Sequence, residues 1–480
     1  MKKRFIILFD KVWNSPTATT WMSYSTRALS LFVILPLVLK KFPEEEIALW
    51  YLFSTVIALQ GIMDLGFRST FIRLISYAHA GAKDIETISK HTKRSILDVP
   101  NWELVGKLYS NMIYIYRILA LIAFIVIGTA GTWAMIKPIF QTDDLLSSWL
   151  SWGVVAVASV YKFYGAIYSN YLEGLNKIPL VRRWESLTSI AGSVTSIIAL
   201  LFTNDLLVLV STNQFWVIAS VARNFYLSRA IEGHQFSKLR ITNKFDKEIF
   251  NRIWPVAWRS GISGIMSNGL VNITSILYAQ IGTSGDVASY LLAVRIITQV
   301  KEISMAPFYS KIPLYSKLRI QGEIRELISK AQKGMFLSHL IYILGVIAVG
   351  LGSEFVISLL DSNIKFISND LWILLSIAYF VHRFGAMHMQ LYLTTNHVIS
   401  HIADGVSGII FVIISFALIS TYGLYAIPIG MLAGYLGFYA WYATSASVKS
   451  LSINFYNFER KTSMIPLLLF AFYVFIAYII

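Results

Sequence analysis

Charged side chains interrupt the apolar segments of this sequence. The clearest case is the segment from 46 to 83, which begins as a near-continuous apolar run but contains Asp64 and Arg68 four residues apart. On a helix these two residues would share one face and could pair. A charge at the centre of a bilayer costs roughly 2.5–3.5 kcal/mol on insertion scales. We therefore expect this segment to face a wet interior rather than lipid.

Cations outnumber acids at the same depth along the sequence. Pairing cannot neutralise them all, so the excess implies water or a bound anion. A guanidinium binds a phosphate through two parallel hydrogen bonds, and we therefore expect the arginines to line a cavity for an anionic head group such as a pyrophosphate. The alternative for any single arginine is a structural bond to helix-end carbonyls. The predicted substrate-binding residues are Arg27, Arg68, Arg117, Lys162, Arg295, Lys301 and Arg383.

A second group of buried titratable residues could couple transport to an ion gradient. A carboxylate at membrane depth can hold a proton or a sodium ion, which makes Asp64, Glu302 and Asp404 candidates. His382 is a further candidate, and His388 lies on the same predicted span. The alternative for both histidines is a neutral ring that is hydrogen-bonded inside a helix bundle.

Composition places the chain among polytopic membrane proteins. Its 480 residues are 56% hydrophobic and 14% charged, whereas a soluble domain carries about 25% charge. The absence of cysteine excludes thiolate metal sites and cysteine nucleophiles. No metal-binding spacing, phosphate-cradling loop or nucleophile elbow is present, so no enzyme and no cofactor are predicted, apart from a possible coupling H+ or Na+.

Apolar runs predict twelve spans and a thirteenth near the end of the chain. Lysine and arginine concentrate in alternate loops, which predicts a cytoplasmic N-terminus. The first residues are basic with only a short apolar run, unlike a signal peptide. Most of the net charge of +15 is thus a topology signal, and no nucleic-acid partner is expected. The predicted spans are 19–39, 47–71, 108–134, 147–172, 180–203, 206–229, 256–281, 287–309, 334–360, 370–394, 398–420, 423–446 and 464–480.

The two halves of the chain resemble each other. Residues 165–178 and 385–398 both begin with Gly-Ala, and 46–52 is similar to 286–292. Six spans in each half give both halves the same orientation in the membrane. This predicts an all-α membrane protein of two six-helix lobes around a central cavity.

Charge and span positions set the expected domain limits. The N-lobe covers 1–229 and a basic cytoplasmic linker covers 230–255. The C-lobe covers 256–446, and a linker with an extra span covers 447–480.

Two sequence motifs resemble a known family. Residues 60–81 contain DLGF at 64–67, then Arg73, and end in an Ala-x-Ala-Gly pattern at 78–81. The segment YLEGLNK at 171–177 closes the fourth span. These motifs and the twelve-span plan resemble the bacterial polysaccharide flippases, the O-antigen and exopolysaccharide exporters of the multidrug/oligosaccharidyl-lipid/polysaccharide (MOP) superfamily.

The resemblance implies a MATE/MOP-like fold and a flippase in the bacterial inner membrane. Such a protein moves an undecaprenyl-diphosphate-linked oligosaccharide from the cytoplasmic to the periplasmic leaflet by ion-coupled alternating access. Its partners would be the lipid-linked oligosaccharide, membrane lipids, a polysaccharide polymerase and a chain-length regulator. Related murein-precursor flippases carry arginines on spans one, two and eight, where Arg27, Arg68 and Arg295 stand in this sequence. The thirteenth span departs from the simplest family members.

Two other functions stay open. A multidrug or cation antiporter of the same fold is disfavoured because an excess of arginine and lysine repels cationic substrates. A membrane-embedded glycan polymerase would need a large outer loop with essential charged residues. The longest predicted outer loops here are only 135–146 and 361–369.

Overall fold

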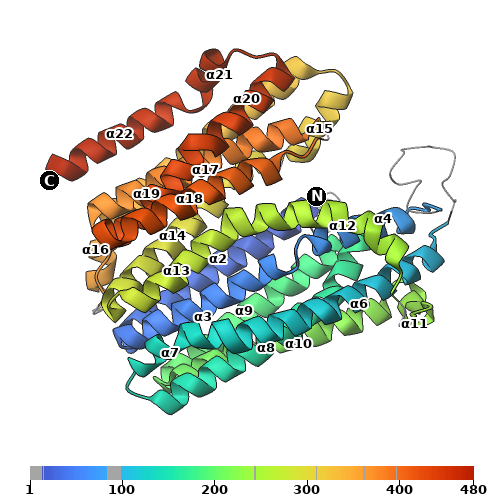
Figure 1. Cartoon of the computed structure of the whole chain (residues 1–480), viewed down its shortest axis with the longest axis horizontal. Helices are drawn as coiled ribbons and strands as arrows, with labels where there is room; N and C mark the ends of the chain where they lie inside the picture. The colour runs from blue at the N-terminus through green and yellow to red at the C-terminus, as the bar shows by residue number, and fades with distance from the viewer. Residues whose placement is uncertain are drawn as a thin grey trace, which may run out of the picture. The chain divides into compact units, whose positions relative to one another are not determined.

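The computed structural model shows an all-helical chain (Figure 1). The part of the chain that it describes contains no β-sheet, so the predicted all-α class is confirmed. Two compact units are formed by residues 1–264 and 265–480, and the division falls inside the predicted span 256–281. The described residues are 13, 16–83, 99–242, 245–309, 311–359, 364–395 and 397–479.

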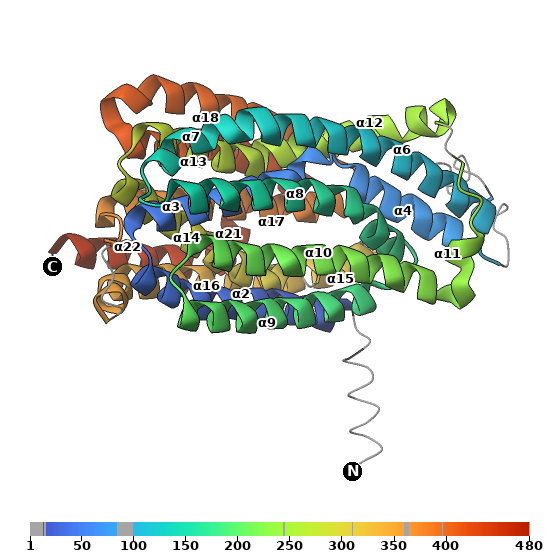
Figure 2. The same cartoon turned by 90° about the horizontal axis from the view of Figure 1, so that it is seen from below.

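Unit 1, residues 1–264, is built mainly from long helices that pack side by side. Helix α8 lies along α10 and α6, and α2 lies along α9 (Figure 2). Helix α12, at the end of the unit, packs against α4. The elements are α2 (Pro16–Lys41), α3 (Glu44–Met63), α4 (Phe67–His79), α6 (Trp102–Val126), η2 (Ile127–Gly131), α7 (Thr132–Phe140), α8 (Leu145–Gly174), α9 (Ile178–Phe202), α10 (Leu206–Ala230), η3 (Glu232–His234), α11 (Gln235–Lys238) and α12 (Lys247–Gly264).

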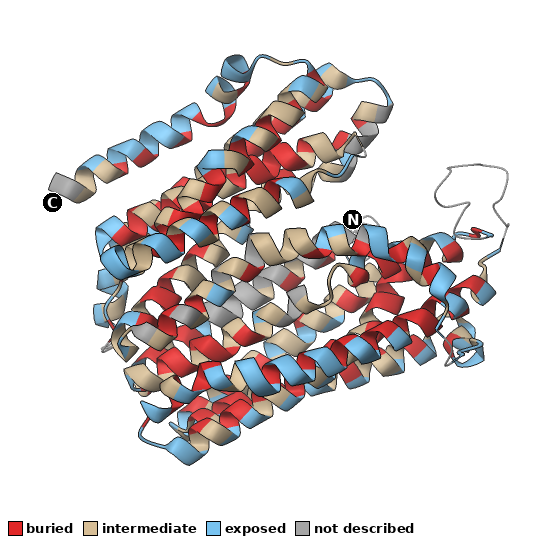
Figure 3. Ribbon diagram, in the orientation of Figure 1, coloured by how far each residue is buried: buried red, intermediate tan, exposed pale blue. Residues whose placement is uncertain are grey.

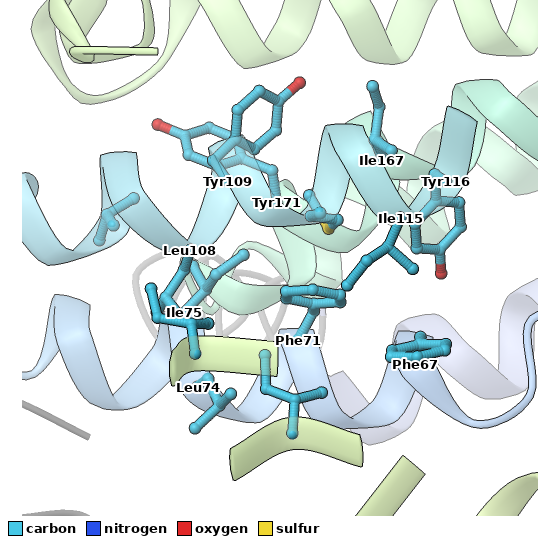
Figure 4. Close-up of a cluster of buried hydrophobic side chains, with 14 of the residues drawn as sticks. Phe67, Phe71, Leu74, Ile75, Leu108, Tyr109, Ile115, Tyr116, Ile167 and Tyr171 are labelled. Atoms are coloured by element: carbon cyan, nitrogen blue, oxygen red, sulfur yellow. The ribbon is translucent and has the colours of Figure 1, made fainter. Parts of the chain in front are cut away.

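The core of unit 1 gathers around α4. Phe71 and Ile75 of α4 are fully buried against Leu108 of α6 and Tyr171 of α8 (Figure 4). The 3.6-residue repeat puts the apolar positions of α4 on one side, which fixes the face of the helix that points away from this core.

Unit 2, residues 265–480, is organised around α17. This helix contacts α14, α16, α19 and α20, and most of its described residues are buried. The elements are η4 (Ile265–Gly269), α13 (Leu270–Ile281), α14 (Ser284–Tyr309), α15 (Ile312–Ile320), α16 (Ile324–Leu359), α17 (Asn369–Leu393), α18 (Ser400–Tyr422), η5 (Gly423–Tyr425), α19 (Ala426–Gly434), η6 (Tyr435–Tyr439), α20 (Ala440–Leu451), α21 (Phe455–Thr462) and α22 (Met464–Ile479).

Every predicted span coincides with a helix or a run of helices, but the second is not continuous as predicted. Helix α3 ends at Met63 and α4 begins at Phe67. Between them Leu65 and Gly66 have φ angles of 50° and 76°, which lie in the left-handed region and cannot continue a right-handed helix.

Only some of the described helices are long and apolar enough to cross a bilayer by themselves. The spans that carry the charged candidates Arg68, Lys301 and Arg383 are not in this group. The helical runs that qualify are Trp102–Phe140, Leu145–Gly174, Ile178–Phe202, Leu206–Ala230, Ile324–Leu359 and Ser400–Leu451.

The extra C-terminal span is a bent pair of helices. Helices α21 and α22 meet at an angle of 58° and together are apolar enough to span. Helix α22 packs on α16, and its outer side is exposed along most of its length (Figure 3). The contact depends on Gly350, because a Cβ there would lie 2.7 Å from Cζ of Tyr473.

We predict that Gly350→Ala lowers the apparent midpoint of thermal unfolding, because overpacking a close contact costs about 1–3 kcal/mol. Gly352→Ala on the same helix is the matched control, since a Cβ there meets no atom within 4 Å. Tryptophan fluorescence at one heating rate follows both variants. Equal midpoints for the two alanine variants would contradict the α16–α22 packing.

Candidate functional site

The break in the second span is stabilised by its own aspartate. The carboxylate of Asp64 accepts hydrogen bonds from the backbone amides of Gly66 at 2.9 Å and Arg68 at 3.3 Å. These amides belong to the start of α4, where a helix has no internal acceptors for its N–H groups. Asp64 therefore caps α4 and also places a negative charge at the positive end of the helix dipole.

Two glycines let the break pack directly against α12. A Cβ on Gly66 would lie 2.6 Å from Cβ of Ser260, and a Cβ on Gly261 would lie 2.8 Å from the Leu65 Cα. Gly66 also has a positive φ, which glycine adopts at no steric cost. The backbone of α12 thus reaches the backbone of the break without an intervening side chain.

A pocket of about 270 Å³ opens at this junction. Asp64 and Arg68, two of the predicted site residues, both line this pocket. Ser69 and Ser260 line it as well and were not among the predicted residues. The lining residues are Asp64, Gly66, Arg68, Ser69, Ile72, Ser260, Gly261 and Gly264.

Arg68 pairs with Glu173 of α8 rather than with Asp64, the partner that helical spacing would allow. Its Nη2 atom lies 2.9 Å from Oε1 of Glu173, which is 7% exposed. Arg182 Nη2 lies 3.4 Å from the same oxygen and Arg182 Nη1 lies 2.8 Å from Glu185. The pairing differs because the break turns α4 relative to α3 and the Asp64 carboxylate already binds two amides.

Among the described residues, the ion pairs of this network join Arg68 and Arg182 to Glu173 and Glu185. Arg68 is therefore one of the cations whose charge a carboxylate balances. The Arg68 side chain is nevertheless 43% exposed and borders the pocket, so it can also contact an incoming group. Glu173 belongs to the 171–177 motif, and this motif was the available signal for its role.

The other predicted cations of unit 1 lie elsewhere. Arg117 on α6 and Lys162 on α8 are exposed. Arg27 belongs to α2, and its side chain lies outside the described residues.

In unit 2, two of the predicted cations are held by aromatic rings. Lys301 Nζ lies 5.6 Å from the ring centre of Tyr379. Arg383 is fully buried, with its guanidinium carbon 4.3 Å from the ring centre of Tyr342. Arg295 on α14 is partly buried.

The predicted coupling residues of unit 2 occupy different environments. Glu302 is exposed, and Asp404 on α18 is buried. The His382 ring packs against Tyr435 and Tyr439, with ring centres 4.7 and 5.3 Å away.

His388 joins three helices of unit 2. It is fully buried on α17, with Nδ1 2.6 Å from Ser447 Oγ on α20 and Nε2 3.0 Å from Glu459 Oε1 on α21. The sequence analysis did not find Glu459, because it lies in a segment expected to be a linker. Its contact anchors the bent C-terminal pair.

A polar cluster fixes the far end of α4. Lys177 Nζ lies 2.6 Å from the Glu232 carboxylate and lowers the pKa of that carboxyl. The Nε2 atom of His79 lies 4.0 Å from the same carboxylate. Burial lowers the pKa of His79. The contribution of Glu232 to stability is therefore present above about pH 4.3, its unfolded value, and is lost as the pH falls further.

No protein-family model and no curated protein matches this sequence. Solved structures do match it in fold. An inward-facing multidrug resistance MATE family transporter of the MOP superfamily gives a TM-score of 0.65 at 13% identity, covering 91% of this chain and 94% of the other. The chain therefore has a MATE/MOP-like transporter fold.

Two further structures support this assignment. The lipid II flippase MurJ in an inward closed conformation gives a TM-score of 0.63 at 15% identity, with 96% and 98% of the two chains covered. The Vibrio cholerae MATE transporter VcmN in its bent form gives 0.55 at 13% identity, with 95% and 99% covered. The predicted MATE/MOP-like fold is confirmed.

We predict that Gly261→Ala lowers the unfolding midpoint by displacing the break, with an overpacking cost of about 1–3 kcal/mol. Gly264→Ala is the control on the same pocket wall, because a Cβ there meets nothing within 4 Å. Thermal unfolding in detergent compares the two. A Gly261→Ala protein as stable as the control would show that the backbone contact does not matter.

We also predict that Glu173→Gln is more destabilising than Arg68→Gln. The first change leaves two arginines without the carboxylate between them, at a cost of about 1–3 kcal/mol, while the second leaves Arg182 on Glu173. The control is Lys107→Gln in an exposed pair with Glu103, where less than about 1 kcal/mol is expected. The opposite order of unfolding midpoints would refute the shared-carboxylate arrangement.

Proposed function

We propose that this chain is a flippase for a lipid-linked oligosaccharide diphosphate. The main support for the proposal is the position of Arg68, whose guanidinium is partly exposed at the edge of the pocket beside the helix break. The fold supports a transporter, and one protein with this fold is described as a lipid II flippase. MATE structures match about equally well, so fold does not separate a flippase from a drug antiporter.

The charge and size of the site favour the flippase. Arg68 is the cation among the residues that line the pocket, and its guanidinium attracts a diphosphate and repels a cationic drug. The pocket of about 270 Å³ is below the roughly 300–1,000 Å³ typical of sites for drug-sized ligands. A compact anionic group attached to a lipid fits such a site better.

In the proposed mechanism, Arg68 is paired with Glu173 before the substrate binds. A diphosphate competes with Glu173 for the in-plane N–H groups of Arg68, and Glu173 keeps Arg182 as its partner when Arg68 moves. Asp64 borders the same pocket, so its negative charge opposes anion binding. Proton uptake by Asp64 would remove that repulsion, so the protonation state of this residue would control substrate binding.

The remaining parts of the proposal concern residues outside this pocket, the location of the protein and its partners. Arg27, Arg117, Lys162, Arg295 and Lys301 are proposed to contact the substrate at other stages of transport, with Glu302, Asp404 and His382 as further coupling residues. We also propose a bacterial inner-membrane location, a cytoplasmic N-terminus, and a polymerase and chain-length regulator as partners.

We predict that Arg68→Gln reduces flipping by about 10–100-fold, because a charged hydrogen bond contributes about 1.5–3 kcal/mol. Full-length protein in vesicles would be given undecaprenyl diphosphate bearing one labelled sugar, and the label reaching the opposite leaflet would be measured. Arg325→Gln, an exposed change outside the pocket, is the control.

A matched monophosphate probe completes the assay. The proposal expects slower flipping of the monophosphate by the unmodified protein and a smaller effect of Arg68→Gln on it. Full activity of Arg68→Gln on the diphosphate, or no flipping by the unmodified protein, would reject the proposal.

A further inference from the structure

The interior of unit 2 contains polar atoms that no described residue satisfies. Arg383, His339 and Ser338 are completely buried. The Arg383 Nε and Nη1 atoms, both ring nitrogens of His339 and the Ser338 hydroxyl have no hydrogen-bond partner in the described part of the chain. Buried polar groups are normally paired, so a group of unpaired atoms points to an occupant.

These three side chains come from two neighbouring helices. Arg383 of α17 donates from Nη2 to the Ser338 carbonyl of α16 at 2.9 Å. His339 follows Ser338, and its ring centre lies 4.9 Å from Phe380 and 6.2 Å from Phe384. Because Phe380 and Phe384 flank Arg383 along α17, the unpaired atoms share one small region.

The charge of Arg383 is also unbalanced. No described carboxylate forms a salt bridge with it, in contrast to Arg68 of unit 1. The ring of Tyr342 covers the face of the guanidinium, with 4.3 Å between Cζ and the ring centre. A ring on that face cannot accept from the N–H groups, which lie in the guanidinium plane.

We propose that a small monovalent anion of the chloride class binds between Arg383, Ser338 and His339. Arg383 would donate its free in-plane N–H groups, Ser338 its hydroxyl and His339 one ring N–H. A water molecule could accept some of these bonds, but it would leave the buried positive charge unbalanced. A small ion is the occupant that suits a site at which all three residues are completely buried.

This anion site would be separate from the pocket at the helix break. None of its three residues lines that pocket. Its role would be structural, in holding α16 against α17 around an otherwise costly charge.

Thermal unfolding of the full-length protein in detergent tests the proposal. Chloride would replace gluconate at constant ionic strength, with the intrinsic tryptophans as the probe. Once chloride exceeds its dissociation constant about tenfold, we expect the midpoint to rise by about 1–2 °C. Arg383→Gln and Ser338→Ala should reduce this rise, while Arg325→Gln, an exposed change on α16, should keep it.

Bromide provides a second measurement that does not depend on a folded variant. Crystals of the unmodified full-length protein grown with bromide should give an anomalous peak within hydrogen-bond distance of Arg383 and Ser338. A midpoint that does not respond to chloride, an unchanged response in Ser338→Ala, or no bromide peak at this position would overturn the proposal.

Discussion

The two hydrogen bonds from backbone amides to the Asp64 carboxylate hold the second membrane segment in two pieces. They supply acceptors at the start of α4 where the helix itself has none. With the break in place, Arg68 points to α8 rather than along α3, and the backbone at Leu65 comes against Gly261. The pocket, the ion-pair network and the orientation of α4 all depend on this local structure.

The positive charges of Arg68 and Arg383 have different partners in the two units. In unit 1, Arg68 and Arg182 share Glu173, so charge is balanced within a network that still borders a pocket. In unit 2, Arg383 has a carbonyl and an aromatic ring but no described carboxylate. In the first arrangement Arg68 can exchange Glu173 for an anionic substrate, because Glu173 stays paired with Arg182. For the second arrangement we propose a fixed counter-ion.

The helical class and the positions of the spans could be predicted from sequence, because long apolar runs admit few structures in a membrane. The break could not, although Gly66 within the DLGF motif was a signal. Leu65 adopts its left-handed geometry beside Gly261, a contact between residues far apart in sequence. The same tertiary effect explains the pairing of Arg68: helical spacing favours Asp64, whereas the folded chain supplies Glu173.

We propose that Arg68 at the helix break binds the diphosphate of a lipid-linked sugar. A high-resolution structure of the full-length protein with undecaprenyl diphosphate bearing one sugar tests it most directly. We expect phosphate oxygens within hydrogen-bond distance of the Arg68 guanidinium, and we expect Glu173 to remain paired with Arg182. A bound diphosphate far from Arg68, with the Arg68–Glu173 pair unchanged, would contradict it.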